Sequence, residues 1–270
     1  MLGKLFKYEF KSTAKVFSPL YITLLVVAII NGFFLNSEMF NIKGLLMMVF
    51  GALLIALFVI TVVVLIQRFS KNLLGDEGYL MFTLPVKSSS IILSKYLVAI
   101  LWTVLSGIVS VVAFFLITFI PLVMDGAINL SEYFGIFAEG LKIVFQSDYI
   151  TFVINIMLLV FISYSMFIFT VYLALSMGQL PVFNNHRNLA SFISFIGINV
   201  LISSIRNLFM TMFFKVSGEQ MLLNIEINSL NDATTIINSG FIFGIVVNLV
   251  LLVGLFFGTK FILDKKLNLE

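Results

Sequence analysis

The residues that could hold a metal, bind a nucleotide or transfer a proton are few in this chain. Among 270 residues there is one histidine, His186, and no cysteine, which excludes disulfides, Cys-ligated zinc and iron–sulfur clusters. No G-x-x-x-x-G-K-[ST] string occurs, so nothing resembles the P-loop that holds nucleotide phosphates. H-E-x-x-H, G-x-S-x-G and paired intramembrane carboxylates are also missing. A membrane protease or hydrolase would therefore lack its acid–base or metal-binding groups, and we expect no catalytic activity, metal or cofactor in this chain.

Neutral polar side chains within the apolar segments are the remaining candidates for substrate binding: Asn155, Ser163, Tyr164, Ser165, Asn199 and Asn248. Such groups more often hydrogen-bond between membrane helices, and we favour that interpretation over a substrate site. Ion-coupled transporters place ionisable groups or broken helices at the bilayer midplane. Here the apolar segments hold no charged residue before their last turn, which argues against transport powered by this chain alone.

The overall composition indicates whether these segments lie in water or in a lipid bilayer. The chain is 61% hydrophobic and 11% charged, compared with about 45–50% apolar and ~25% charged residues in an ordinary soluble domain. A soluble fold cannot bury that much apolar surface, so the sequence predicts an all-α integral membrane protein. The net charge of +3 gives no reason to expect nucleic-acid binding.

Six segments are long enough to cross the bilayer, because ~30 Å of hydrocarbon requires about 20 apolar residues in a helix. They are 16–35, 44–67, 96–123, 149–177, 189–205 and 241–263. The first is flanked by lysines and is followed by further spans without an A-x-A-like site. We therefore expect it to be retained rather than cleaved as a signal peptide.

The orientation follows from the distribution of lysine and arginine between the connecting segments. With the N-terminus inside, twelve of the 16 basic residues lie on the cytoplasmic side, and eight of the 13 acidic residues lie outside. The inverted arrangement would reverse this bias. Six spans then place both termini in the cytoplasm.

Residues 1–15 form an amphipathic pattern with the 3.6-residue helical period. The residues expected at the membrane interface are Lys4, Phe6, Lys7, Phe10 and Lys11, with the lysines toward headgroups and the phenylalanines toward acyl chains. Glu9 breaks the pattern because it projects near the apolar side. The segment is either a basic anchor that sets topology or a lever that touches a cytoplasmic partner.

The segment 68–95 is the longest cytoplasmic connection, and it is too apolar for a solvated tether. Gly75 and Gly78 permit tight turns, Pro85 ends any helix before it, and the serines at 88–90 can cap the third span. We expect a short helix across the cytoplasmic face, packed on the membrane or on another protein. A plain structured loop is the alternative.

Two longer segments are expected on the outer side. Apolar residues at helical spacing in 124–148 predict an interfacial helix, whereas 206–240 is less regular. Arg206 lies seventeen residues after Leu189, about 26 Å along a helix, which favours the outer interface. If the helix continues to Phe214, Arg206 is instead intramembrane and must face the bundle.

Four stretches resemble the permease subunits of type-2 ATP-binding-cassette exporters. They are GDEGYLMFTLP at 75–85 with Val86 and Lys95, GQLPVFNNHR at 178–187, KYEFK near the N-terminus and KKLNLE at the end. The family also carries a large outer segment between its last two spans, similar to 206–240. Together with six spans, the resemblance covers nearly the whole chain.

The resemblance implies partners and a coupling site. In the family, a coupling helix between spans two and three sits in a groove of the ATPase subunit; the corresponding residues are Gly75, Asp76, Glu77, Gly78, Tyr79, Leu80, Leu84 and Pro85. The N-terminal amphipathic helix would be a second contact. The implied complex has two permease chains and two ATPase chains, with ATP and magnesium bound by the ATPase. We expect it in a bacterial plasma (inner) membrane.

The aromatic content of the spans bears on the cargo. The 31 phenylalanines and nearly uncharged spans favour an amphipathic or hydrophobic cargo, such as a cytolytic peptide of the phenol-soluble-modulin kind, another antimicrobial peptide, a drug or a lipid. Lipid-facing surfaces also require apolar residues, so a second class stays open: a non-transporting immunity or sensory subunit. An ion-coupled carrier is the third.

Overall fold

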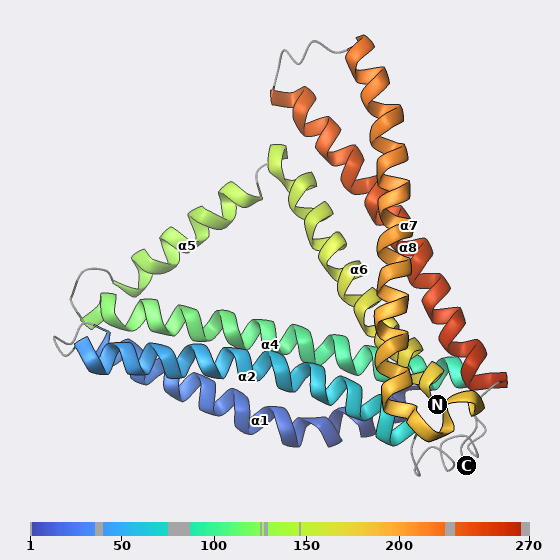
Figure 1. Cartoon of the computed structure of the whole chain (residues 1–270). Helices are drawn as coiled ribbons and strands as arrows, with labels where there is room; N and C mark the ends of the chain where they lie inside the picture. Colours follow the sequence, from blue (N-terminus) through green and yellow to red (C-terminus); the bar gives the residue numbers. More distant parts are fainter. Residues whose placement is uncertain are drawn as a thin grey trace. The chain divides into compact units, whose positions relative to one another are not determined.

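The computed structural model describes residues 2–35, 40–74, 87–124, 126, 129–145, 147–224 and 230–265. Nearly all of these residues are helical (Figure 1). The long elements are α1 (Leu2–Phe34), α2 (Phe40–Leu73), α4 (Ser88–Met124), α6 (Ser147–Gly178), α7 (Arg187–Asn224) and α8 (Leu230–Lys265). Two shorter ones are α5 (Leu130–Val144) and the 3-10 helix η1 (Pro181–His186).

Six of these helices are long and apolar enough to cross a membrane. The qualifying stretches are Gly3–Phe34, Ile42–Lys71, Ser88–Met124, Ile150–Gly178, Arg187–Phe213 and Asn238–Lys265. Each contains or closely matches one of the six predicted spans, which confirms their number and order along the chain. The orientation of the termini and the coupling helix stay predictions.

Helix α1 differs from the predicted division at residue 15. It runs without interruption for 33 residues, with Pro19 inside it, and would be about 50 Å long at the usual helical rise. The expected N-terminal helix and the first span are therefore joined. A missing proline N–H costs the helix a hydrogen bond but does not have to end it.

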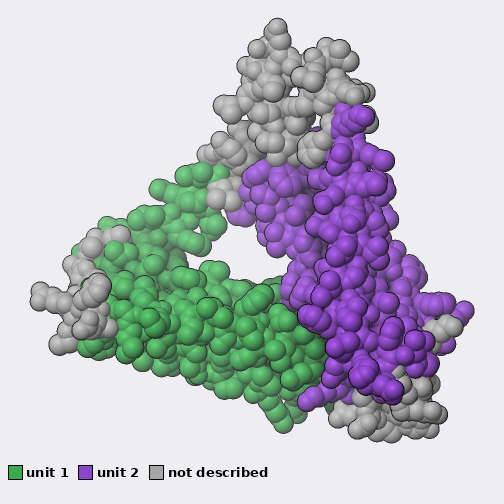
Figure 2. All heavy atoms as spheres, viewed as in Figure 1, with its two compact units in different colours: residues 1–68, 84–143 green, residues 69–83, 144–270 purple. Residues whose placement is uncertain are grey.

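The chain divides into two compact units, which Figure 2 shows in different colours. The first comprises residues 1–68 and 84–143, and α1 packs along α4 within it. Its buried core includes Phe17, Leu24, Trp102, Ala113 and Ile117, together with residues of α2. A Cβ on Gly32 would lie 2.8 Å from Cβ of Ile120, so α1 and α4 approach closely because this position has no side chain.

The second unit comprises residues 69–83 and 144–270. Helix α6 packs against both α7 and α8. Asn155 of α6 donates a hydrogen bond to Asn238 of α8 at 3.2 Å, which confirms the interhelical interpretation for Asn155. Phe69, at the end of α2, stacks on Tyr172 of α6 with ring centroids 4.0 Å apart.

Candidate functional site

The predicted coupling residues, Gly75 to Leu80 with Leu84 and Pro85, lie outside the described residues. Their role stays a prediction. Both helices that flank them are described, and Arg68 of α2 and Lys95 of α4 form a buried polar site with Glu9 of α1. This site brings together the N-terminal part of α1, the end of α2 and the beginning of α4.

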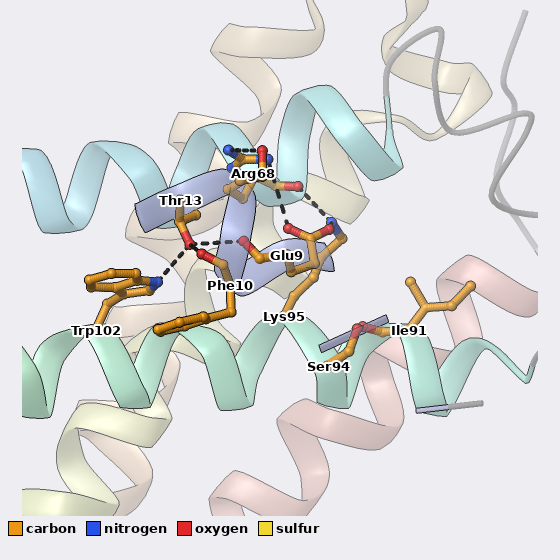
Figure 3. Close-up of polar contacts among 9 residues, drawn as sticks. Glu9, Phe10, Thr13, Arg68, Ile91, Ser94, Lys95 and Trp102 are labelled. Carbon is orange, nitrogen blue, oxygen red and sulfur yellow. Dashed lines mark hydrogen bonds and ion pairs between the residues drawn. The ribbon is translucent and has the colours of Figure 1, made fainter. Parts of the chain in front are cut away.

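Glu9 and Lys95 form a buried ion pair at the centre of the site (Figure 3). Nζ of Lys95 donates a hydrogen bond to Oε1 of Glu9 at 2.7 Å, and the side chain of Lys95 is 1% exposed. Arg68 approaches the other carboxylate oxygen at 3.9 Å from the exposed side. One carboxylate thus forms ion pairs with two cations that come from two other helices.

Lys95 also connects the two ends of the predicted coupling segment. Its Nζ donates a second hydrogen bond to the backbone carbonyl of Arg68 at 3.0 Å. Arg68 in turn donates from Nη2 to the hydroxyl of Ser12 at 2.8 Å. The first and last residues of segment 68–95 are therefore in direct contact, and α1 is bound to both.

A second polar contact lies one turn further along α1. The indole Nε1 of Trp102 donates to Oγ1 of Thr13 at 2.6 Å, and the Thr13 hydroxyl donates back to the carbonyl of Glu9 at 2.8 Å. Trp102 is stacked between Phe10 and Phe17, with ring centroids 4.9 Å and 4.6 Å away. The Thr13 hydroxyl thus connects the aromatic stack to the backbone of Glu9.

Helical spacing explains why these side chains meet. Glu9 and Thr13 are four residues apart on α1, while Lys95 and Trp102 are seven apart on α4, so each pair occupies one face of its helix. Because α1 and α4 lie side by side, the two faces meet in matching order. A buried charge requires such a partner, since removing an ion from water costs several kcal/mol.

The predicted interfacial residues of α1 divide between two environments. Lys4, Lys7 and Lys11 are exposed, as the pattern predicts, whereas Phe6 and Phe10 are partly buried against the core of the first unit. The phenylalanines therefore contact protein rather than only acyl chains.

The sequence indicates that Glu9 faces the apolar side of its helix, but it does not identify Lys95 as the partner of Glu9. Glu9 is the only acidic residue before Glu38, and this isolation was the available signal.

A second feature is an open groove in the second unit, between α6 and α7. It has a volume of about 460 Å³, within the ~300–1,000 Å³ range of ligand pockets. Its polar lining residues are Ser163, Thr170, Asn199, Ser203 and Arg206, and apolar residues including Met166 and Phe195 complete it. Where residues are described, no group of three or more His, Asp or Glu residues could hold a metal ion.

The longer of the two expected helix lengths is the one observed, and the depth of Arg206 in the bilayer stays a prediction. Helix α7 continues through Arg206 to Asn224, and the apolar stretch that includes Arg206 ends at Phe213. Arg206 nevertheless follows Arg187 by nineteen residues, about 28 Å along the helix. The two arginines are thus separated by about the thickness of the hydrocarbon layer.

These features define the class of protein: a helical, multi-pass membrane protein with a buried ion-pair cluster in its first unit. The chain matches no protein-family model, no curated protein and no solved structure.

Proposed function

We propose that this chain is the transmembrane permease subunit of an ATP-binding-cassette exporter. Two copies would form the translocation pathway, and two copies of a separate ATPase subunit, which binds ATP and magnesium, would drive it. The observation that carries the proposal is the contact between Arg68 and Lys95. It joins the ends of the segment whose sequence resembles the coupling region of that family.

The cluster is suited to transmit a displacement of segment 75–86. Because Lys95 bonds both Arg68 and Glu9, a force on the segment would reach α2, α4 and α1 at one buried point. A buried, directly bonded ion pair resists separation far more than a solvated surface pair. ATP-driven closure of the ATPase dimer would push this point and switch the pathway between inward-facing and outward-facing states.

The test is co-purification of the detergent-solubilised chain with a co-expressed ATP-binding-cassette ATPase of the same organism, a gene neighbour where there is one, followed by ATPase and export assays. We expect a complex that contains equal numbers of permease and ATPase chains. We also expect its rate of ATP hydrolysis to differ from that of the ATPase alone. Glu77→Arg and Leu80→Asp should uncouple hydrolysis from export, because each places an unfavourable charge on the coupling surface. Glu139→Arg, at an exposed position of α5, makes the same acid-to-base change away from that surface and should leave coupling intact.

Each outcome has a distinct meaning. Normal stimulation and export in both loop variants would refute the coupling role of the segment. Failure to associate with the ATPase would refute the permease assignment and favour an ion-coupled carrier or a signalling or immunity subunit. We further propose an amphipathic or hydrophobic cargo. Export of only a hydrophilic solute would overturn that cargo class but not the permease assignment.

A further inference from the structure

We propose that the groove between α6 and α7 binds one anionic phospholipid, with its phosphate on Arg206 and an acyl chain along the apolar part of the groove. This inference does not rest on the exporter assignment. It rests on the lining of the groove, on the exposure of Arg206 and on the position of Arg206 along α7.

The groove is lined by polar residues towards one end and by aromatic residues towards the other. On α7, Asn199, Ser203 and Arg206 follow one another at the i, i+4, i+7 spacing of a single helix face. Since a short turn at η1 joins α6 to α7, the two helices are antiparallel, and Ser163 of α6 belongs to the Arg206 end. The other end holds Phe167 and Phe195, whose ring centroids are 6.3 Å apart.

The groove is as long as a substantial part of an acyl chain. Its α7 residues run from Phe195 to Arg206, about 16 Å at the helical rise of ~1.5 Å per residue. Met166 and Thr170 form its buried floor, while Val200 and Ile196 are exposed on its rim. A molecule can therefore enter sideways from the bilayer and present its apolar chain to the floor.

Arg206 lacks a partner within the part of the chain that the structure describes: it makes no hydrogen bond or ion pair there, and its side chain is exposed. Its distance of about 28 Å from Arg187 places it at the depth of the phosphates when Arg187 lies at the opposite interface. A guanidinium binds phosphate through paired, charge-assisted hydrogen bonds.

A second copy of the chain fits this groove less well. A two-fold interface uses the same patch on both copies, so an interface centred on the groove would bring two Arg206 side chains together. No carboxylate of the lining residues would separate them. An anionic lipid supplies the missing negative charge, whereas a second copy supplies another positive one.

The experiment is native mass spectrometry of the purified, delipidated full-length chain, titrated with phosphatidylglycerol or phosphatidylcholine. The wild-type chain should bind one phosphatidylglycerol per copy, about tenfold or more tightly than phosphatidylcholine, because the choline cation of phosphatidylcholine opposes the contact of Arg206 with the phosphate that both lipids carry. Arg206→Gln should abolish this preference, and Arg206→Lys should retain part of it. Lys215→Gln, which removes an exposed cation from the same helix outside the groove, should bind like wild type.

Two further arms separate the alternatives. Ser203→Trp fills the groove but keeps Arg206, so it should also abolish the bound lipid; unchanged binding would overturn the groove as the site. Inorganic phosphate should not displace the lipid, and displacement would indicate a free-anion site instead. Equal binding of both lipids, or wild-type binding by Arg206→Gln, would overturn the proposal. A change of copy number in Ser203→Trp with lipid binding unchanged would identify an interface between copies instead.

Discussion

At the scale of single residues, the buried pair between Glu9 and Lys95 combines two unfavourable transfers from water into one stable contact. Each ion alone would be costly to bury. Their attraction offsets the cost of desolvation only because the distance between the two charged groups is short and further hydrogen-bonding positions of both groups have partners. Lys95 has a second acceptor in the Arg68 carbonyl, and Glu9 has a second cation in Arg68. Removing the Glu9 carboxylate therefore leaves the Lys95 ammonium buried without a negative charge beside it.

Glu9→Gln is expected to lower the stability of the first unit by about 3–5 kcal/mol, since the Lys95 ammonium then remains buried without a carboxylate. Thermal unfolding in detergent, followed by the fluorescence of Trp102, measures this effect. Trp102 is the only tryptophan in the chain and stacks beside the cluster, so its emission reports the packing of α1 on α4.

The matched control for this variant is Glu139→Gln, which changes an exposed acid of α5 in the same way and should leave the midpoint unchanged. The exchange Glu9→Lys with Lys95→Glu restores opposite charges at the site, so it should recover part of the stability lost in either single variant. Equal midpoints for Glu9→Gln and wild type would show that the pair contributes nothing to stability.

At the scale of elements, the hairpin of α6 and α7 depends on a glycine at its tightest point. A Cβ on Gly178 would lie 2.6 Å from the carbonyl oxygen of Arg187 and would contact the Ser191 side chain. The backbone oxygen cannot move without displacing the first turn of α7. Gly178 is also the first residue of the second stretch that carries the family resemblance, so packing alone accounts for a glycine there.

Gly178→Ala should destabilise the second unit by about 1–3 kcal/mol, as overpacking usually does, and should lower the midpoint of thermal unfolding measured by circular dichroism. Gly197→Ala, in the middle of α7 with no atom near the added Cβ, should be neutral or stabilising by up to ~1 kcal/mol, because alanine favours helix. A midpoint for Gly178→Ala at or above that of Gly197→Ala would contradict the close approach.

At the scale of the whole molecule, six apolar helices and the charge bias predict which connections face the cytoplasm. The chain has no cysteine, so single cysteines can report accessibility without background. Ser131 and Asn188 are exposed and are the second residues of α5 and α7, so Ser131→Cys and Asn188→Cys report on the connections at which these helices begin.

A membrane-impermeant maleimide should label Ser131→Cys in intact cells, because its connection is expected outside. Asn188→Cys should react only after permeabilisation, because the basic bias places its connection inside. Quantitative labelling before and after permeabilisation checks both positions, and the cysteine-free wild type is the control. The opposite pattern would invert the topology and remove the coupling segment from the cytoplasm.

The number and order of the membrane helices could be predicted from the sequence. An uninterrupted apolar run can satisfy its backbone groups in a bilayer only as a helix or within a closed barrel, and these runs have helical length. Helix ends were less predictable: α1 continues past residue 15 into the first span without a break, and α7 continues to Asn224. Hydropathy records where the hydrocarbon ends, whereas a helix can extend into the interface as long as its own hydrogen bonds continue.

The partners of the charged residues were decided only by the tertiary structure. Glu9 and Lys95 are separated by 86 positions in the sequence, and Glu9 forms an ion pair with a cation from each of two other helices. The spacing along each helix indicates which residues share a face, but it does not state which faces meet. For the same reason, Arg206 could be placed along its helix from the sequence, while its groove with Ser163 and Thr170 required the packing of α6 on α7. The length and hydropathy of local segments thus determined the elements, and the association of distant helices determined the sites.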